Sequence, residues 1–338
     1  MDIGLIGFGG VSKSFIELLI MKKDKLNIKV KYIINSKGGI YNINGINLEE
    51  LIEFLKEGKS ICKYCGWIDK DININTIIKN KDVDTLVELT STNIENGEPG
   101  YTHIKLALEN KINVVTGNKG PILLNYNELN NIAIKNSVQL CIGCTTGGAL
   151  PSINVGLMDT AGAEILSIEG VLNGTSNYIL KEMYDNNIEY KVALEKAREM
   201  GIAEANPKLD VEGFDTASKI LILANVLMGC NKSISDIDIK GITDISREEI
   251  NLSILNGEKI KLIGEVYREG LEIKCRVKPK LLESSHPLYF VDGKNKGVYY
   301  KTDTLGDVTI IGGASGTINA AASILRDIVN LSKVLKWD

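Results

Sequence analysis

The chain has 338 residues, of which 44% are hydrophobic and 24% charged, as in globular proteins rather than disordered ones. Its formal net charge of −4 argues against nucleic acid or an anionic membrane as a partner. The N-terminus lacks the basic segment of a signal peptide, and the longest apolar stretch, 220–230, is far shorter than the ~18 residues of a membrane span. We therefore expect a cytoplasmic protein, long enough for two domains.

The first part of the chain alternates between strand-like and helix-like patterns, as a parallel α/β sheet requires. Residues 2–6 are predicted to form a buried strand that ends at a glycine turn, after which Phe15, Leu18 and Leu19 share one helix face. A second helix is predicted from Leu48 until Gly58. The other predicted strands are 28–32, 83–89, 112–115 and 138–142. This order predicts a Rossmann-type, doubly wound parallel sheet.

The pattern changes after Pro151. The predicted elements are a strand at 165–172, a helix near 178–184, a polar loop, a long helix at 211–228, strands at 259–266, 271–282 and 298–300, and a C-terminal helix after a glycine cluster. We predict an α+β substrate-binding and dimerisation domain at 141–311. The dinucleotide-binding domain at 1–140 is then completed by 312–338, whose terminal helix returns to it.

A glycine turn joins the first strand to the first helix, with candidate cofactor contacts at Gly7, Phe8, Gly9, Gly10 and Val11. Glycine at the first position permits a tight turn, and at the third it lets the backbone approach a pyrophosphate at the helix N-terminus. Ser12 replaces the last glycine of the G-x-G-x-x-G fingerprint. Dinucleotide binding is favoured over a purely structural turn because the motif lies between a strand and a helix.

Polar residues follow two later strands of the sheet, where ligands of such folds bind. Thr90 and Ser91 follow one strand, and Asn118 and Lys119 follow the next. The alternative for Lys119 is an ordinary solvated lysine. In the second domain, Asn173, Gly174 and Thr175 follow a strand, and their pattern fits helix capping and ligand contact equally well.

The most informative helix carries Asp215 and Lys219, which lie four residues apart and share a face. Such pairs are usually found on the surface. The helix face that they share continues through Ile222 and Val226, however, in a segment that is apolar nearly all round, as in a buried helix. A carboxylate and a lysine at the end of a buried helix suit acid/base chemistry. Reduction of an aldehyde needs a proton for the developing alkoxide, and lysine is a suitable donor in a chain with only two histidines.

The end of the second strand predicts the choice of cofactor. NAD-selective sheets carry an acidic residue there, about 20 residues after the glycine turn. Here the sequence is Ile34-Asn35-Ser36-Lys37, without a carboxylate. Ser36 could donate a hydrogen bond and Lys37 could supply charge to a 2′-phosphate, so NADP(H) is favoured over NAD(H) without excluding the latter. A solvated turn lysine is the alternative.

Six cysteines include the pairs Cys62/Cys65 and Cys141/Cys144. Zinc ribbons place their two pairs much closer in sequence, and neither pair opens a helix as redox pairs do. The chain also has only His103 and His286 to complete a mixed metal site. We therefore interpret the cysteines as structural thiols.

Taken together, these residues resemble the homoserine dehydrogenase family nearly from end to end. The matching segments are the turn at Gly7, Thr90-Ser91, Asn118-Lys119-Gly120-Pro121, 172–180, Gly201-Ile202-Ala203-Glu204-Ala205-Asn206-Pro207, Leu209-Asp210, Asp215, Lys219 and Gly313-Ala314-Ser315-Gly316. The resemblance implies reversible NAD(P)H-dependent reduction of L-aspartate 4-semialdehyde to L-homoserine, in threonine, methionine and isoleucine biosynthesis. It also implies a homodimer, and a monofunctional enzyme without an aspartokinase or an added regulatory domain.

The resemblance further implies residue roles. Lys219 is the proton donor or acceptor, and Lys119 assists near the nicotinamide. Glu204 and Asp215 hold the substrate, with Asp210 and the Asn173–Thr175 segment as further candidate contacts. The cofactor contacts that match the family are Phe8, Gly9, Gly10, Thr90 and Gly316. A sodium-type site of main-chain carbonyls matches Thr146, Gly148 and Leu150, but Gly143 stands where a glutamate is common.

Two other functions fit the sequence less well. Aspartate-semialdehyde dehydrogenase, which uses the same aldehyde, needs a cysteine nucleophile and a histidine acid/base, and neither His103 nor His286 has a suitable sequence context. A nicotinamide-sensing regulatory or scaffold protein would be expected to lose Lys219, Glu204 or Lys119, all of which are present.

Overall fold

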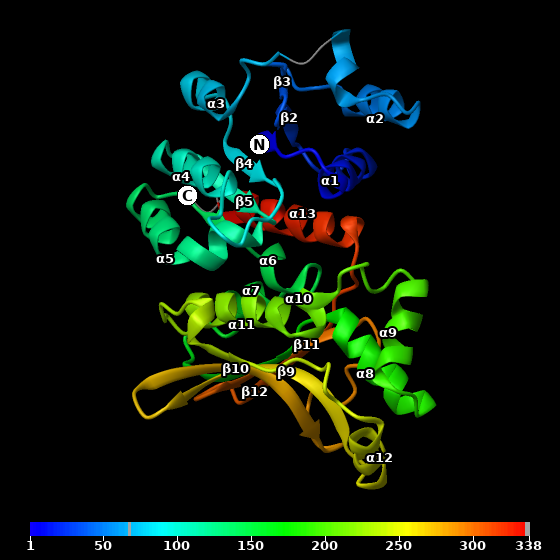
Figure 1. Cartoon of the computed structure of the whole chain (residues 1–338). Coiled ribbons are helices and arrows are strands. Elements are labelled where there is room, and N and C mark those ends of the chain that lie inside the picture. Colours follow the sequence, from blue (N-terminus) through cyan, green and yellow to red (C-terminus); the bar gives the residue numbers. More distant parts are fainter. Residues whose placement is uncertain (67–68, 335–338) are drawn as a thin grey trace. The chain divides into compact units, whose positions relative to one another are not determined.

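The computed structural model describes residues 1–66 and 69–334, which form two compact units (Figure 1). One unit comprises Met1–Thr145 and the C-terminal segment from Gly316, and the other comprises Thr146–Ser315. These boundaries fall a few residues after the predicted ones, which were 140/141 and 311/312.

The first unit is built on a six-stranded sheet of order β3-β2-β1-β4-β5-β6. Its strands are β1 (Asp2–Ile6), β2 (Lys29–Asn35), β3 (Gly38–Tyr41), β4 (Thr85–Glu88), β5 (Asn113–Thr116) and β6 (Leu140–Cys141). All pairs are parallel except β2–β3, which is an antiparallel hairpin. The order runs outward in both directions from β1, as in a Rossmann-type sheet, so the predicted fold class is confirmed. The edge strand β3 was not predicted.

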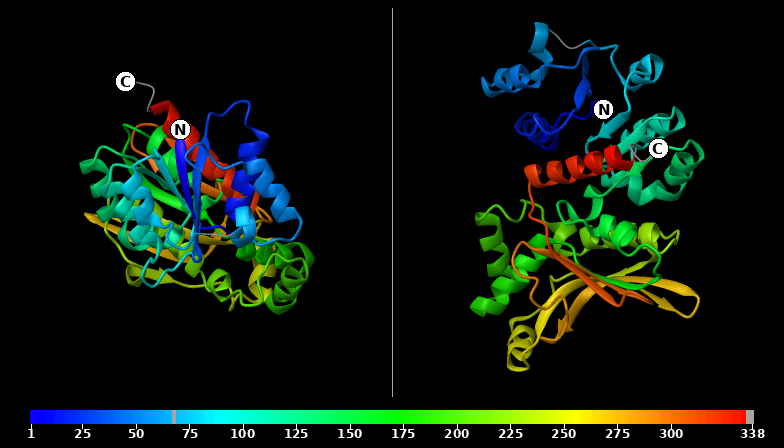
Figure 2. Two further views of the ribbon diagram at one scale, coloured as in Figure 1. Left: turned by 90° about the horizontal axis from the view of Figure 1, so that it is seen from above. Right: turned by 180° about the vertical axis from the view of Figure 1, so that it is seen from behind.

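Helices of the first unit bury the apolar faces that the sequence pattern predicts. They are α1 (Gly10–Met21), α2 (Leu48–Lys56), η1 (Ile61–Gly66), α3 (Ile74–Asn80), α4 (Gly100–Glu109), α5 (Lys119–Lys135), α6 (Cys144–Gly147) and α13 (Thr317–Val334). Phe15, Leu18 and Leu19 of α1 are all buried. Ile324 and Ile328 of α13 belong to the same core, and Ser14 Oγ donates to Thr317 Oγ1 at 3.0 Å. Figure 2 shows α13 among the elements of this unit.

The second unit contains a six-stranded sheet of order β12-β11-β7-β9-β10-β8. Its strands are β7 (Ile165–Val171), β8 (Ile237–Ile239), β9 (Lys259–Glu269), β10 (Glu272–Leu282), β11 (Lys296–Thr302) and β12 (Asp307–Gly312). All pairs are antiparallel except β8–β10. The mixed helices and antiparallel strands agree with the predicted α+β class.

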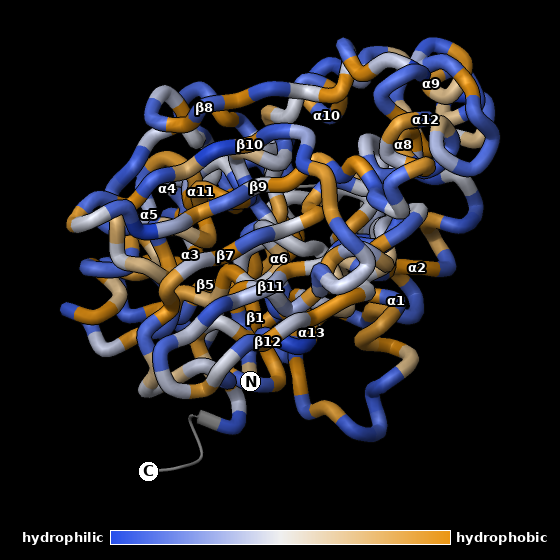
Figure 3. The backbone as a smooth tube through the Cα atoms, turned by 90° about the horizontal axis from the view of Figure 1, so that it is seen from below, coloured by the Kyte–Doolittle hydropathy of each residue, from blue (hydrophilic) through white to orange (hydrophobic). Residues whose placement is uncertain are grey.

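Helices α8, α9 and α11 lie on one face of the second sheet (Figure 1). The helices and turns of this unit are α7 (Ser152–Asn154), η2 (Val155–Asp159), α8 (Gly174–Asn186), α9 (Tyr190–Glu199), α10 (Lys208–Val211), α11 (Phe214–Leu227), η3 (Ile234–Asp236) and α12 (Arg247–Leu255). Figure 3 looks toward the other face, where β9 and β10 lie in the foreground. The segment 283–295 covers one end of this face, because Leu288, Tyr289 and Val291 pack against Val171, Ile263 and Leu282.

Two sequence predictions for the second unit were wrong in detail. The long helix was predicted from Val211, but α10 ends there and α11 begins at Phe214. Gly213 separates them with a φ of +89°, a conformation that a helix interior does not accept. The predicted polar loop before them contains α9, whose buried positions include Ala193 and Ala197. Alanines give little hydrophobic periodicity, so this helix was missed.

Candidate active site

The glycine turn of the first unit requires glycine at its first position. Gly7 has a φ of +92°, and a Cβ built there would lie 2.4 Å from the carbonyl carbon of Leu89. Its N–H donates to Ile34 O at 2.9 Å, which ties the turn to β2. No other residue fits this position without moving the backbone of the neighbouring strand end.

The N-terminus of α1 is open to a ligand. Gly9 is the exposed N-cap, with no side-chain capping bond and no atom within 4 Å of an added Cβ. The first N–H groups of a helix need partners from outside, and an anion such as a pyrophosphate can supply them. Ser12 is fully buried, and its hydroxyl donates to Gly7 O at 2.6 Å. Ser12, which replaces the last glycine of the fingerprint, therefore stabilises the turn through this hydrogen bond. Phe8 and Val11 are half-buried beside it, and Gly10 is exposed.

A fully buried carboxylate, Glu88, connects the polar ends of β4 and β5. Glu88 Oε1 accepts from the N–H of Thr90 at 3.1 Å and, in a shorter contact, from its hydroxyl. Glu88 Oε2 accepts from Thr116 Oγ1 at 3.2 Å. Asn118 Nδ2 donates to Thr90 Oγ1 at 3.1 Å, which joins the two strand ends. The structure thus brings the predicted Thr90 edge and the start of α5 together.

Lys119 and Ser91 extend from this network. Lys119 is the first residue of α5, directly after the N-cap Asn118, whose side chain accepts from Gly120 N at 3.1 Å. Lys119 is half-buried, and Ser91 is exposed next to Thr90. Glu88 was not predicted to be functional, although a charged residue inside an apolar strand is a usable sequence signal.

The end of β2 continues into a two-residue connection formed by Ser36 and Lys37, which leads directly into β3. Both residues are exposed, and the Lys37 N–H donates to Asn35 Oδ1 at 2.8 Å. The connection therefore has a defined path. Gly316, the last predicted cofactor contact, is exposed just before α13 in the same unit.

Lys219 of the second unit lies in a polar cluster at the start of α11. Its Nζ donates to Asp215 Oδ2 at 2.5 Å and to the carbonyl oxygen of Leu172 at 2.9 Å. The side chains of Lys219 and Asp215 are only 15% and 16% exposed. The predicted pair therefore lies where a largely buried helix emerges, with part of its surface still accessible to solvent.

Asn173 links this pair to a second carboxylate. It is the N-cap of α8, and its Oδ1 accepts from Ser176 N at 2.9 Å. Its Nδ2 donates to Asp210 Oδ1 at 2.6 Å and to Asp215 Oδ2 at 2.9 Å. Helix capping by Asn173 is therefore confirmed, and its side chain also holds two carboxylates of the cluster. Ligand contact, the other interpretation, stays a prediction.

The loop that carries Glu204 is tied to the same helix end. Thr175 Oγ1 donates to the carbonyl oxygen of Ile202 at 3.1 Å, and Gly174 is the first residue of α8. Glu204 follows two residues after Ile202 and is exposed. The second unit therefore gathers Lys219, two carboxylates and an amide at one place, with a third carboxylate in an adjoining loop.

Protein groups contact part of the stretch that was predicted to bind a monovalent cation. Lys296 Nζ, on a residue 6% exposed, donates to Gly147 O at 3.1 Å. The carbonyl oxygen of Leu150 accepts from Ser152 N at 2.8 Å, and the Thr146 and Ser152 hydroxyls are 2.7 Å apart. Gly148 adjoins the ammonium group, which is 3.6 Å from its Cβ position. A buried ammonium beside these carbonyls fits a metal cation poorly, because like charges repel.

Both histidines lie beside carboxylates. His103 Nδ1 is 3.7 Å from Glu88 Oε1, and His286 Nε2 is 3.3 Å from Glu169 Oε2.

Burial, followed by the charge of Asp327, raises the pKa of the Cys141 thiol to about 12, so this thiol stays protonated.

Residues 1–66 and 69–334 contain no group of three or more His, Cys, Asp or Glu side chains that could hold a metal ion. None of the helices in this part of the chain is both long and apolar enough to cross a membrane. The side chain of Cys65, and with it the Cys62/Cys65 pair, lies outside the described residues.

The Rossmann-type sheet, the open helix N-terminus and the lysine–carboxylate cluster define the class of a nicotinamide-dependent oxidoreductase. The sequence profile named homoserine dehydrogenase matches residues 151–329. A homoserine dehydrogenase of Methanocaldococcus jannaschii is 40% identical over 98% of both chains. The NAD(+)-dependent homoserine dehydrogenase of Pseudomonas canavaninivorans is 31% identical over 97% of this chain and 95% of its own.

Solved structures agree. A putative homoserine dehydrogenase from Archaeoglobus fulgidus superposes with a TM-score of 0.86 at 33% identity, covering 98% of this chain and 99% of that one. A hyperthermophilic archaeal homoserine dehydrogenase mutant in complex with NADPH gives a TM-score of 0.83 at 25% identity, covering 100% and 98%. The chain belongs to the homoserine dehydrogenase family. The predicted family and enzyme class, an NAD(P)-dependent oxidoreductase, are confirmed.

Proposed function

We propose that this chain interconverts L-aspartate 4-semialdehyde and L-homoserine with Lys219 as the acid/base. The observation that carries the assignment is the half-buried Lys219–Asp215 pair, with Asn173 on the same carboxylate. An ammonium held in this way is a positioned proton donor whose charge also stabilises a developing alkoxide.

A bound nicotinamide supplies the hydride that adds to the aldehyde carbon. Lys219 donates a proton from Nζ to the aldehyde oxygen as that bond forms, which leaves a neutral amine to be reprotonated from solvent. Asp215 accepts from Nζ and keeps it oriented toward the oxygen. In the oxidation of homoserine, neutral Lys219 accepts the hydroxyl proton.

The substrate carries a cationic amino group in both directions of the reaction. Glu204, Asp210 and Asp215 offer carboxylates to this group and to the hydroxyl end. The Asn173–Thr175 segment supplies polar atoms at the start of α8. Charge-assisted hydrogen bonds of this kind are short and directional, so they suit recognition of a small amino acid.

The proposed cofactor contacts lie along the turn at Gly7, at the ends of β4 and β5, and just before α13. They are Gly7, Phe8, Gly9, Gly10, Val11, Thr90, Ser91, Lys119 and Gly316. The absence of a carboxylate at the end of β2, with Ser36 and Lys37 exposed there, supports a preference for NADP(H) over NAD(H). Lys296 Nζ supplies a positive charge at Gly147 O, within the 146–150 stretch, and the proposed proton transfer is assigned to Lys219 without a metal ion.

The proposal includes a cytoplasmic homodimer. The face of the second sheet opposite α11 carries a compensated charge network: Lys280 Nζ bridges Glu169 and Glu265 at 2.9 and 2.6 Å, and Arg276 also pairs with Glu265. Such a face can pack against a second copy without leaving a charge unpaired. Light scattering of the purified chain tests the assembly, and a monomer at micromolar concentration would contradict it.

The reaction is tested by following nicotinamide absorbance with L-homoserine. We expect cofactor reduction that does not depend on phosphate. A reaction that needs both aspartate semialdehyde and phosphate would instead indicate dehydrogenation of the aldehyde, and no turnover with homoserine and either cofactor would contradict the proposal.

A further inference from the structure

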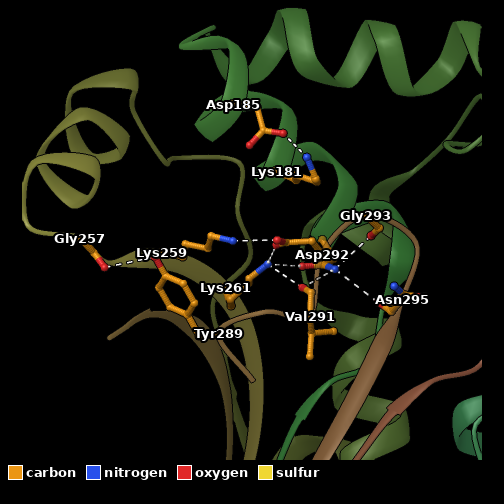
Figure 4. Close-up of polar contacts among 11 residues, drawn as sticks. Lys181, Asp185, Gly257, Lys259, Lys261, Tyr289, Val291, Asp292, Gly293 and Asn295 are labelled. Atoms are coloured by element: carbon orange, nitrogen blue, oxygen red, sulfur yellow. Dashed lines mark hydrogen bonds and ion pairs between the residues drawn. The ribbon is translucent and has the colours of Figure 1, made fainter. Parts of the chain in front are cut away.

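The second unit buries a lysine that the proposed reaction does not use. Lys261 of β9 is 2% exposed (Figure 4). Its Nζ donates to Asp292 Oδ1 and to the carbonyl oxygen of Val291, both at 2.6 Å, and to Asn177 Oδ1 at 3.1 Å. All three protons of the ammonium group therefore have partners.

Asn177 of α8 completes this network and is 1% exposed. Its Nδ2 donates to the carbonyl oxygens of Val291 and Gly293 at 3.0 Å each, and approaches that of Asn295 at 3.3 Å. The amide nitrogen thus contacts three carbonyls of one loop, while the amide oxygen accepts from Lys261. The rotation of the Asn177 side chain is fixed from both ends.

The same helix turn reaches the proposed site. The Asn177 N–H donates to the carbonyl oxygen of Asn173 at 3.2 Å, one helical turn earlier. Asn173 is the residue whose amide contacts Asp210 and Asp215, and the preceding Leu172 O accepts from Lys219. The position of the first turn of α8 therefore determines where two partners of the Lys219–Asp215 pair lie.

We propose that Lys261 and Asn177 are positioning residues that fix the first turn of α8 and thereby orient the Asp215–Lys219 pair for proton transfer. This inference rests on the proposed role of Lys219. A buried ammonium is a costly way to gain stability, because apolar residues of similar size often serve as well or better. A buried polar network can instead specify one geometry, and a catalytic lysine needs such a geometry. Burial also lowers the pKa of Lys261, against the raising effect of Asp292.

Lys259 provides a matched control on the same strand. Its Nζ pairs with the other oxygen of the same carboxylate, Asp292 Oδ2, at 2.7 Å. It lies over the rings of Tyr184 and Tyr289, with centroids 5.6 and 4.8 Å away, and does not share the Asn177 contact of Lys261. Lys259→Met and Lys261→Met each remove one ion pair to Asp292, but only the second releases Asn177.

The experiment compares these variants with wild type by thermal unfolding, cofactor binding, kcat, and the pH profile of kcat/KM for homoserine. We expect Lys261→Met to lower kcat by about 10-fold to 100-fold, as for a misplaced catalytic group, and to displace the pKa of the essential base. Cofactor affinity should stay near wild type. Lys259→Met should lose thermal stability but keep the wild-type kcat and pH profile.

A milder variant keeps the test decisive if Lys261→Met does not fold. Asn177→Ser, assayed below its melting temperature, should show the same displaced pH profile. Where Lys261→Met does fold, the effects of the two substitutions should not add. A wild-type kcat and pH profile in every folded variant of Lys261 and Asn177 would overturn the inference, as would equal kinetic losses in Lys259→Met. Lys219→Ala is measured in parallel: an active Lys219→Ala refutes the proposed function itself, whereas an inactive one with normal Lys261 and Asn177 variants refutes only the positioning role.

Discussion

Asn173 and Lys219 donate hydrogen bonds to the same atom, Oδ2 of Asp215, at 2.9 and 2.5 Å. One carboxylate oxygen therefore holds both the N-cap of α8 and the ammonium group of α11. The ammonium group is also held by the carbonyl oxygen of Leu172, and the carboxylate by Asn173, so the direction of the lysine is fixed more tightly than in a surface ion pair.

Removal of Lys219 tests the acid/base assignment. Lys219→Ala should lower turnover by about 10²-fold to 10⁴-fold, the usual contribution of a positioned acid/base, with cofactor affinity near wild type. Steady-state kinetics and cofactor fluorescence titration measure the two quantities. Lys208→Ala is a suitable control, since Lys208 forms a long, exposed pair with Glu212 at 3.9 Å. Turnover near wild type in Lys219→Ala would remove this lysine from the mechanism.

Replacement of either of two carboxylates should weaken the binding of the substrate more than the binding of the cofactor. Glu204→Gln and Asp215→Asn are each expected to weaken transition-state binding of homoserine by roughly 1–3 kcal/mol, the cost of an unpaired polar group. The loss should appear in kcat/KM for homoserine, while the dissociation constant of the cofactor changes little. Calorimetry gives the affinity for homoserine directly. Unchanged affinity in both amides would show that these residues do not hold the substrate.

Local patterns in the sequence were sufficient for much of the first unit and for one pair in the site. The apolar face of Phe15, Leu18 and Leu19 and the four-residue spacing of Asp215 and Lys219 are periodic features, and both are seen in the structure. The helix α9 was missed because its buried positions are alanines.

Contacts between distant segments could not be predicted from such patterns. Asn173 meets Asp210 only because α8 and α10 pack together in the folded chain, and Glu88 meets Thr116 only because β4 and β5 are neighbours. A single sequence contains no periodicity that reports such pairs. Lys261 could have been noticed as a charge in an apolar strand, but its partner Asn177 could not.

Acid should destabilise the second unit through Glu265. Burial opposes ionisation of this carboxyl, but hydrogen bonds from Arg276 and Lys280 outweigh it and hold the pKa of Glu265 below its usual value. The native state then binds fewer protons than the unfolded state, so stability is present above the unfolded pKa and is lost as the pH falls through the folded pKa. Thermal unfolding between pH 7 and pH 3 should show this loss, and Glu265→Gln should flatten it relative to Glu199→Gln. A melting temperature independent of pH over that range would contradict the assignment.

The preference for NADP(H) over NAD(H) is expected to depend on Lys37. Lys37 is exposed in the two-residue connection between β2 and β3, next to Ser36, and no carboxylate lies in the 34–39 segment. An acid there would bind the ribose 2′-hydroxyl of NAD(H) and repel the 2′-phosphate of NADP(H), whereas a lysine attracts it. We expect wild type to bind NADP(H) more tightly than NAD(H). Lys37→Ala should lose most of that difference while its affinity for NAD(H) stays the same.

Titration of both cofactors into both proteins measures this difference in affinity, and the expected preference should weaken with added salt because the contact is exposed. Lys29→Ala, at the other end of β2, controls for a general change in charge. Equal affinities in wild type, or an unchanged NADP(H) affinity in Lys37→Ala, would show that this strand end does not select the cofactor.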